Sequence, residues 1–193
     1  MKINGKIDLK RKYAEYCPYC FSEKIEEIIL ISRVSYACKS CGKKTGRLII
    51  IDQKLKFWVD KKKNYWHESV GVFIFNKKNE ILLIHRTKFP IGYAIPAGHL
   101  DKDELPENGA KREVFEEVGL KLKELKLVSE EDILNDPCRR GADQHNWHLY
   151  KAIIGRQKIK INNESESFVW CKKEDALKLN LVALTRHFLE KYF

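Results

Sequence analysis

The stretch from Gly98 to Leu120 constrains the fold of this 193-residue chain more than any other part. It contains residues that favour the two ends of a helix, and its charged residues recur at helical spacing. Pro106 suits the first turn of a helix, where a missing N–H costs nothing, and Gly119 suits the left-handed position just past the end. The sequence therefore predicts a helix from about residue 106 to residue 118.

The charged face of this helix carries glutamates at positions i, i+3 and i+4, namely Glu113, Glu116 and Glu117. Carboxylates placed side by side repel one another, so we expect a cation among them. Oxygen ligands favour Mg²⁺ or Mn²⁺, and Mg²⁺ commonly adds substrate phosphates to its shell. An adjoining apolar arc, interrupted by Lys111, is expected to dock the helix on a sheet: Ala110, Val114, Phe115 and Val118.

The order of residues in and before this helix resembles the Nudix box, carried here by Gly98, Glu104, Arg112, Glu113, Glu116, Glu117 and Gly119. The resemblance implies metal-assisted hydrolysis of a nucleoside diphosphate linked to another group, such as ADP-ribose, a dinucleotide or an NTP. It also implies that the box glutamates and the backbone carbonyl of Ala97 bind Mg²⁺ or Mn²⁺. Arg112 resembles the arginine that orients these carboxylates.

The residue that accepts the proton of the attacking water is left open. We rank the box glutamates first, and Glu164 and Glu166 in a later loop are the other candidates.

Four of the six cysteines form two pairs in the pattern C-x2-C-x17-C-x2-C: Cys17, Cys20, Cys38 and Cys41. Two such knuckles suit tetrahedral Zn²⁺ bound by four thiolates, and a site filled by protein ligands is structural. The pattern resembles a zinc ribbon, with strands expected at residues 25–34 and 47–51. We expect zinc to contribute most of the folding free energy of this small module, residues 13–52.

The alternative for these cysteines is a pair of disulfides, which would need an oxidising compartment that nothing else in the sequence indicates. Cys138 and Cys171 stand alone. They are interpreted as ordinary reduced thiols, because a catalytic role would need a nearby base that the sequence does not place.

Two nearly continuous β-branched and aromatic runs, residues 69–75 and 81–84, predict strands buried on both faces and joined by a turn at 76–79. The two covers are expected to be the box helix and a C-terminal helix with apolar residues at helical spacing: Leu181, Leu184, Phe188 and Tyr192. The predicted fold class is α/β, a Nudix α/β/α sandwich with a mixed sheet at 67–193. A strand and linker at 53–66 and the β zinc ribbon at 13–52 precede it.

The run from Asn135 to Tyr150 departs from core patterning and is expected to be loop-like, so we place substrate selection here. Arg139 and Arg140 could fork onto phosphates and Trp147 could stack on a base, although a plain surface loop is equally compatible. Glu164 and Glu166 complete the predicted substrate-binding set. The gap between His145 and His148 matches some metal sites, but no acid or cysteine partner is evident, so a second metal there is disfavoured.

The net charge of +10 and the isoelectric point near 9.2 favour anionic partners, which include nucleotides, nucleic acids and anionic membranes. The lysines are scattered, and residues 61–63 form the one run of three, so no compact footprint selects nucleic acid. No apolar run approaches about 18 residues, and the first twelve residues are too polar for a signal peptide. We therefore expect a cytoplasmic protein with no membrane contact.

A zinc ribbon followed by a Nudix domain resembles the architecture of the NADH pyrophosphatase branch. That branch carries a proline-rich Ser-Gln-Pro-Trp-Pro-Phe-Pro stretch after its box, whereas Pro137 is the only proline after Glu107 here. The main hypothesis is therefore a pyrophosphohydrolase of a small nucleotide. The alternatives are the same chemistry on an RNA 5′ end and a nucleotide-binding regulator without turnover. A homodimer that completes the site is left open.

Overall fold

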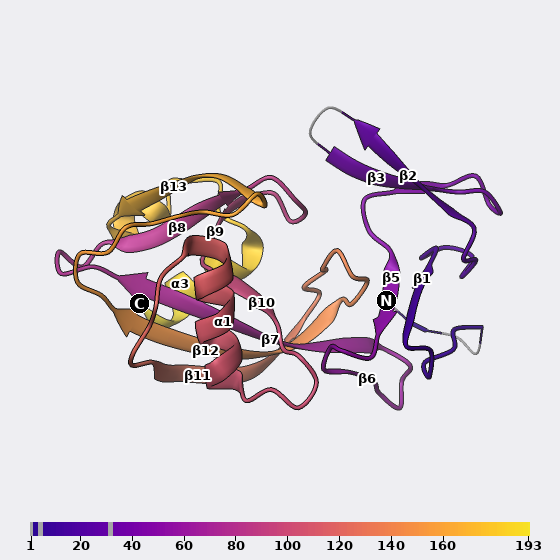
Figure 1. Cartoon of the computed structure of the whole chain (residues 1–193), viewed down its shortest axis with the longest axis horizontal. Coiled ribbons are helices and arrows are strands. Elements are labelled where there is room, and N and C mark those ends of the chain that lie inside the picture. The colour runs from indigo at the N-terminus through magenta and orange to yellow at the C-terminus, as the bar shows by residue number, and fades with distance from the viewer. Residues whose placement is uncertain (1, 4–5, 31–32) are drawn as a thin grey trace.

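The N-terminal part of the molecule consists of short strands. A computed structural model describes the chain except for residues 1, 4–5 and 31–32. In it, β1 (Tyr13–Tyr16) pairs antiparallel with β5 (Ile49–Asp52), and β2 (Ile25–Leu30), β3 (Arg33–Cys38) and β4 (Lys44–Thr45) form a separate antiparallel sheet (Figure 1). The strand expected at 25–34 is therefore two strands. Residues 31–32, between them, lie outside the described part.

The larger part of the molecule is built on one mixed sheet with the order β11-β12-β7-β8-β13. Its central strands β7 (Tyr65–Phe75) and β12 (Gln144–Ile153) run parallel, while β11 (Lys126–Leu134), β8 (Ile81–Arg86) and β13 (Ser165–Cys171) pair antiparallel with their neighbours. Three short strands extend it: β6 (Phe57–Val59) and β10 (Ala97–His99) on β7, and β9 (Gly92–Ala94) on β8.

Two helices cover the two faces of this sheet, which confirms the predicted sandwich (Figure 1). Helix α1 (Pro106–Val118) packs Ala110, Val114 and Val118 on one face, and α3 (Ala183–Tyr192) packs Phe188 and Leu189 on the other. A short helix α2 (Lys173–Ala176) precedes α3. No helix in the described residues is long and apolar enough to cross a membrane.

The boundaries of α1 follow the sequence signals. Pro106 lies in the first turn, and Gly119 has φ +70°, with its N–H bonded to the carbonyl of Phe115. The prediction that Phe115 belongs to the docking face is wrong, because its side chain is 51% exposed. It lies one position beyond Val114, which turns it about 100° away from the sheet.

A third apolar cluster joins the N-terminal strands to the sandwich. Ile49 and Ile51 of β5 and Tyr16 of β1 pack there with Tyr65 of β7 and Ala142 of a later loop. The Tyr65 hydroxyl also donates to the carbonyl of Ile50 at 2.6 Å. The boundary predicted between residues 66 and 67 falls inside β7 and stays a prediction.

Candidate functional site

Arg112 of α1 binds the acidic residues around it. Its guanidinium donates to both carboxylate oxygens of Glu104 at 2.9 and 2.7 Å and to Glu113 at 2.6 Å. It also reaches Glu116 at 3.4 Å and the carbonyl of His99 at 3.1 Å. The hydrogen bonds from Arg112 lower the pKa of Glu104. Arg112 therefore holds in place the loop before α1 and two glutamates of the charged face.

The glutamates of the charged face differ in exposure. Glu117 is 6% exposed and accepts a hydrogen bond from the N–H of Ala97 at 2.9 Å, with Arg86 at 4.0 Å. Burial raises the pKa of Glu117 to about 8 and also raises that of Glu113. The side chain of Glu116 is 54% exposed. The helix thus offers one buried carboxyl group, one that is partly buried with 14% of its side chain exposed, and one that reaches solvent.

Gly98 lets β10 approach α1 closely. A Cβ at this position would lie 2.0 Å from the carboxyl carbon of Glu113, so a larger residue would displace this carboxylate from its place on the cavity. Because side chains alternate along a strand, Ala97 and His99 face the opposite side of the sheet from Gly98. The backbone of β10 therefore contacts the box glutamates, whereas the side chains of Ala97 and His99 lie on the opposite face of the sheet.

All three glutamates and Arg112 line one cavity of about 710 Å³, which Ala97 and Gly98 also border. In the described residues these carboxylates do not gather within 4.8 Å of one another; Arg112 and the Ala97 N–H hold them instead. The donor set of carboxylate and carbonyl oxygens fits Mg²⁺ or Mn²⁺. A cation here would favour the charged form of Glu117, whose burial otherwise opposes ionisation.

The predicted substrate-binding residues divide into two groups. Arg139, Arg140, Trp147 and Glu164 line the cavity. Arg139 lies 3.7 Å from Glu164, which also pairs with Lys88 at 2.7 Å. Glu166 is exposed on β13, pairs with His85, and is absent from the described lining of the cavity. Of the two later glutamates, Glu164 is therefore the one placed to meet a substrate.

The loop-like run expected at residues 135–150 is wrong for its second half, which forms the central strand β12. Trp147 is accordingly 7% exposed and packs against Phe188 and His145, and its indole N–H donates to Asp136 at 2.8 Å. This burial leaves little of the ring for stacking on a base. Both faces of β12 are covered, so its sequence lacks the polar alternation that marks a half-exposed strand.

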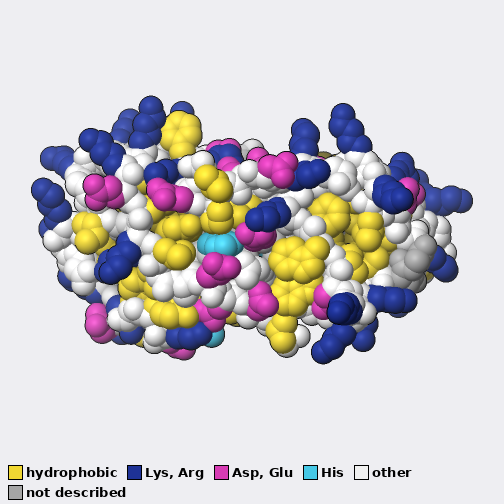
Figure 2. Space-filling model, turned by 90° about the horizontal axis from the view of Figure 1, so that it is seen from below, with side chains coloured by type: hydrophobic (Ala, Val, Ile, Leu, Met, Phe, Trp, Pro, Cys, Tyr) yellow, Lys and Arg dark blue, Asp and Glu magenta, His cyan; other side chains and the backbone are white. Residues whose placement is uncertain are grey.

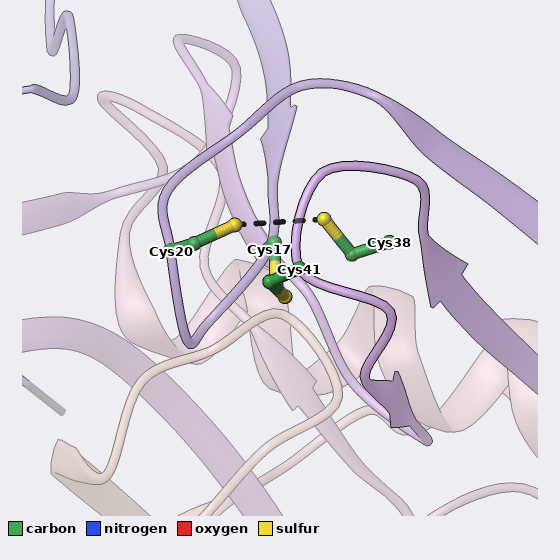
Figure 3. A group of neighbouring side chains, drawn as sticks. All are labelled: Cys17, Cys20, Cys38 and Cys41. Atoms are coloured by element: carbon green, nitrogen blue, oxygen red, sulfur yellow. Dashed lines mark hydrogen bonds between the residues drawn. The ribbon is translucent and has the colours of Figure 1, made fainter.

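The four cysteines of the N-terminal pairs face one another across two loops (Figure 3). Sγ–Sγ distances are 3.7 Å for Cys17 and Cys41 and 3.5 Å for Cys20 and Cys38. Zn–S bonds of about 2.3 Å at tetrahedral angles place two sulfurs about 3.8 Å apart, so the cluster fits zinc. Although burial opposes it, backbone N–H groups of Cys41 and Ser40 lower the pKa of Cys38 to about 6, which favours a thiolate.

The structure also gathers residues that sequence reasoning did not connect. His67, His99, Cys138 and His145 offer ligand atoms that all lie within 4.8 Å of one another. Although burial opposes it, the pKa of the Cys138 thiol lies well below its usual value, because His67, His145 and His99 face it. The interpretation of Cys138 as an isolated thiol is therefore wrong.

The spacing of His145 and His148 did not identify this group. Residues three apart on a strand point to opposite faces, and His148 lies 2.8 Å from Glu68 on the α1 side instead. The partners of His145 come from other strands. One sequence signal could have indicated the cluster: Cys138 and His145 lie seven residues apart in a run that is poor in aliphatic residues.

The family profile described as the NUDIX domain matches residues 65–192, well over half of the chain. The chain therefore belongs to the Nudix family, and the predicted resemblance is confirmed.

Curated relatives match part of the chain. Human diphosphoinositol polyphosphate phosphohydrolase 3-alpha is 27% identical over 113 residues, which cover 55% of this chain and 63% of the relative. Mouse diphosphoinositol polyphosphate phosphohydrolase 2 is also 27% identical over 113 residues, with 55% and 58% covered. The chain thus spans less than two thirds of the length of these relatives.

Solved structures share the fold. MutT NUDIX hydrolase from Burkholderia pseudomallei has a TM-score of 0.57 at 25% identity, covering 65% of this chain and 97% of that one. The NUDIX domain of NrtR from Shewanella oneidensis, complexed with ADP ribose, has a TM-score of 0.57 at 19% identity, covering 69% and 90%. A Caenorhabditis elegans Ap4A hydrolase has a TM-score of 0.53 at 24% identity, covering 65% and 93%.

Proposed function

We propose that the chain hydrolyses the pyrophosphate bond of a nucleoside diphosphate linked to another group, such as ADP-ribose, a dinucleotide or an NTP. The observation that carries this proposal is the placement of Glu113, Glu116, Glu117 and Arg112 on one cavity that has room for a nucleotide. Family membership and the phosphoanhydride substrates named for several relatives support it.

Glu113, Glu116 and Glu117, with the carbonyl of Ala97, would hold Mg²⁺ or Mn²⁺. A bound ion supplies charge neutralisation on the phosphate oxygens and lowers the pKa of a bound water. Arg112 positions Glu113 through the 2.6 Å hydrogen bond and keeps this carboxylate aligned on the helix face. The box glutamates are our first choice of proton acceptor, and Glu164, which lines the same cavity, is the second.

A panel assay tests the proposal. The purified chain with Mg²⁺ or Mn²⁺ is incubated with ADP-ribose, NADH, diadenosine polyphosphates, NTPs, capped RNA and a diphosphoinositol polyphosphate, and products are resolved by chromatography. We expect cleavage between phosphorus atoms of a small nucleotide, abolished by EDTA and restored by the metal. Turnover of the inositol compound alone would reject the nucleoside part of the proposal, and no turnover of any compound would reject the activity.

The distribution of charge on one face of the molecule gives the RNA alternative no support. On the face drawn in Figure 2, lysine and arginine side chains are spread over the rim and both ends instead of forming one track. Binding to an RNA 5′ end would weaken steeply with salt, whereas a small nucleotide that contacts few cations would show a shallow dependence. A steep dependence in the panel assay would favour RNA.

Arg139 is proposed to bind a substrate phosphate. Replacing it by alanine is expected to raise KM about tenfold and to change kcat less than about threefold, because a charge-assisted hydrogen bond to the bound substrate is lost. Steady-state kinetics with the best substrate measures both constants. Arg156→Ala, which removes an exposed arginine outside the cavity, is the matched control. Equal KM values for Arg139→Ala and the unmodified chain would exclude this role.

We also propose that Cys17, Cys20, Cys38 and Cys41 bind a structural Zn²⁺, with residues 13–52 as its ribbon. The sulfur distances support this assignment. All four ligand positions would be filled by protein, which leaves none for substrate. The role of the ribbon zinc would therefore be to stabilise the fold, and it would take no direct part in catalysis.

A further inference from the structure

We propose that His67, His99, His145 and Cys138 bind a second structural zinc ion, at the end of the sandwich that meets the substrate cavity. This inference does not depend on the proposed activity, because it concerns a separate set of ligands and is tested by metal content.

The three histidines lie side by side on neighbouring strands. His67 of β7 is the register partner of His145 of the parallel strand β12, and β10 places His99 opposite Ser69, two residues along β7 from His67. All three imidazoles point to the face covered by α3. Their ring centroids lie 4.6 to 5.7 Å apart. The sheet itself thus presents three nitrogen donors to one point.

The fourth donor comes from the loop between β11 and β12. This loop places the Cys138 thiol 3.6 Å from Nδ1 of His67. Zinc bonds of about 2.3 Å to sulfur and about 2.0 Å to nitrogen, at a tetrahedral angle, place the two donor atoms about 3.5 Å apart, close to the observed distance. Four sulfur and nitrogen donors that all lie within 4.8 Å of one another match what a tetrahedral zinc site needs.

The surroundings of the cluster also fit a metal. His67 is fully buried and His145 is 1% exposed, so water has little access to the donor atoms of the cluster. Nδ1 of His145 lies 3.0 Å from a carboxylate oxygen of Asp136, although the two atoms are not aligned for a hydrogen bond. The same carboxylate accepts the indole N–H of Trp147. A carboxylate beside a histidine is a common outer partner of a zinc ligand.

A zinc ion here would attach the loop at residues 135–143 to the sheet. The same loop carries Arg139 and Arg140, which line the substrate cavity beside Cys138 and His99. Its position is also set from the other side, because the carbonyls of Arg139 and Arg140 accept hydrogen bonds from Leu48 and Ile50. The ion would therefore act as a positioning element for the cavity wall. With four protein ligands it has no open site for chemistry.

Metal content tests the proposal on the full chain. After removal of loosely bound metal, elemental analysis is expected to find about two zinc ions per chain, one for each cluster. Cys138→Ala and His99→Ala should each reduce the content to about one. Cys171→Ala, the matched cysteine control outside both clusters, should leave it at about two.

A second measurement needs no variant and so does not depend on how well variants fold. X-ray absorption at the zinc edge should find an average of about 2.5 sulfur and 1.5 nitrogen ligands per zinc, the mean of one four-sulfur site and one site with one sulfur and three nitrogens. A single zinc per chain with a shell of four sulfurs would overturn the proposal. So would two zinc ions that persist in both Cys138→Ala and His99→Ala.

The competing use of these residues is a Cys138 nucleophile activated by a histidine. A zinc-bound thiolate is shielded from alkylation, whereas a catalytic thiolate reacts readily. With zinc-loaded protein we expect iodoacetamide to spare Cys138 until a strong chelator is added, as read by peptide mass spectrometry. Rapid alkylation of Cys138 while the zinc content stays unchanged would overturn the metal site.

Discussion

Replacing Glu116 with glutamine is expected to lower kcat by at least about 10²-fold, equivalent to about 2.7 kcal/mol of transition-state stabilisation. The substitution keeps the size of the side chain and removes the negative charge that we propose as a metal ligand. Because this side chain is 54% exposed, the fold should tolerate the change. Steady-state kinetics with the substrate identified by the panel assay gives kcat, and thermal unfolding checks that the fold is retained.

Glu107 provides the control on the same helix. It lies in the first turn of α1, is 52% exposed and pairs with Lys111, so Glu107→Gln removes a comparable surface charge without touching the cavity lining. We expect its kcat to stay within about twofold of the unmodified chain, because an exposed ion pair contributes little. If Glu116→Gln and Glu107→Gln had the same small effect, Glu116 would have no place in the mechanism.

Replacing Cys17 with serine is expected to release the zinc of the ribbon and to reduce the free energy of unfolding by at least about 3 kcal/mol. Cys17 is fully buried, and the strands around it form only a small core, so three remaining thiolates cannot hold the module together. Zinc content and thermal unfolding, each with and without EDTA, measure the two effects.

The matched control for this prediction is Cys171→Ser. Cys171 is half-buried on β13 and belongs to neither ligand cluster, so the zinc content should be unchanged and the free energy of unfolding should fall by no more than about 1 kcal/mol. Retention of all zinc and of the unfolding temperature in Cys17→Ser would contradict the zinc assignment of the four N-terminal cysteines.

Features of the molecule that are encoded locally were predictable from the sequence. The bounds of α1 followed from Pro106 and Gly119, and the gathering of the four N-terminal cysteines followed from their spacing. The two covered faces followed from continuous apolar runs and two amphipathic helices. In each case the residues that specify the feature also form it, either as neighbours in the sequence or at a regular spacing.

The cluster of His67, His99, His145 and Cys138 was not predictable in the same way. Its members come from three strands and a loop, and the parallel register of β7 and β12 brings them together. That register depends on pairing between segments almost 80 residues apart in sequence, such as His67 and His145. Strand β12 was not predicted because its first half is rich in polar residues and histidines, a composition typical of a loop, although several of these side chains are buried.

Strand β7 begins at Tyr65 in the cluster beneath β5 and continues without a break into the centre of the sandwich. A chain cut between residues 66 and 67 would lose Tyr65 and its bond to the carbonyl of Ile50. The ribbon and the hydrolase part should consequently unfold in a single cooperative transition, because β7 belongs to the apolar cores of both. A substitution that destabilises either part should then lower the unfolding temperature of the other part as well.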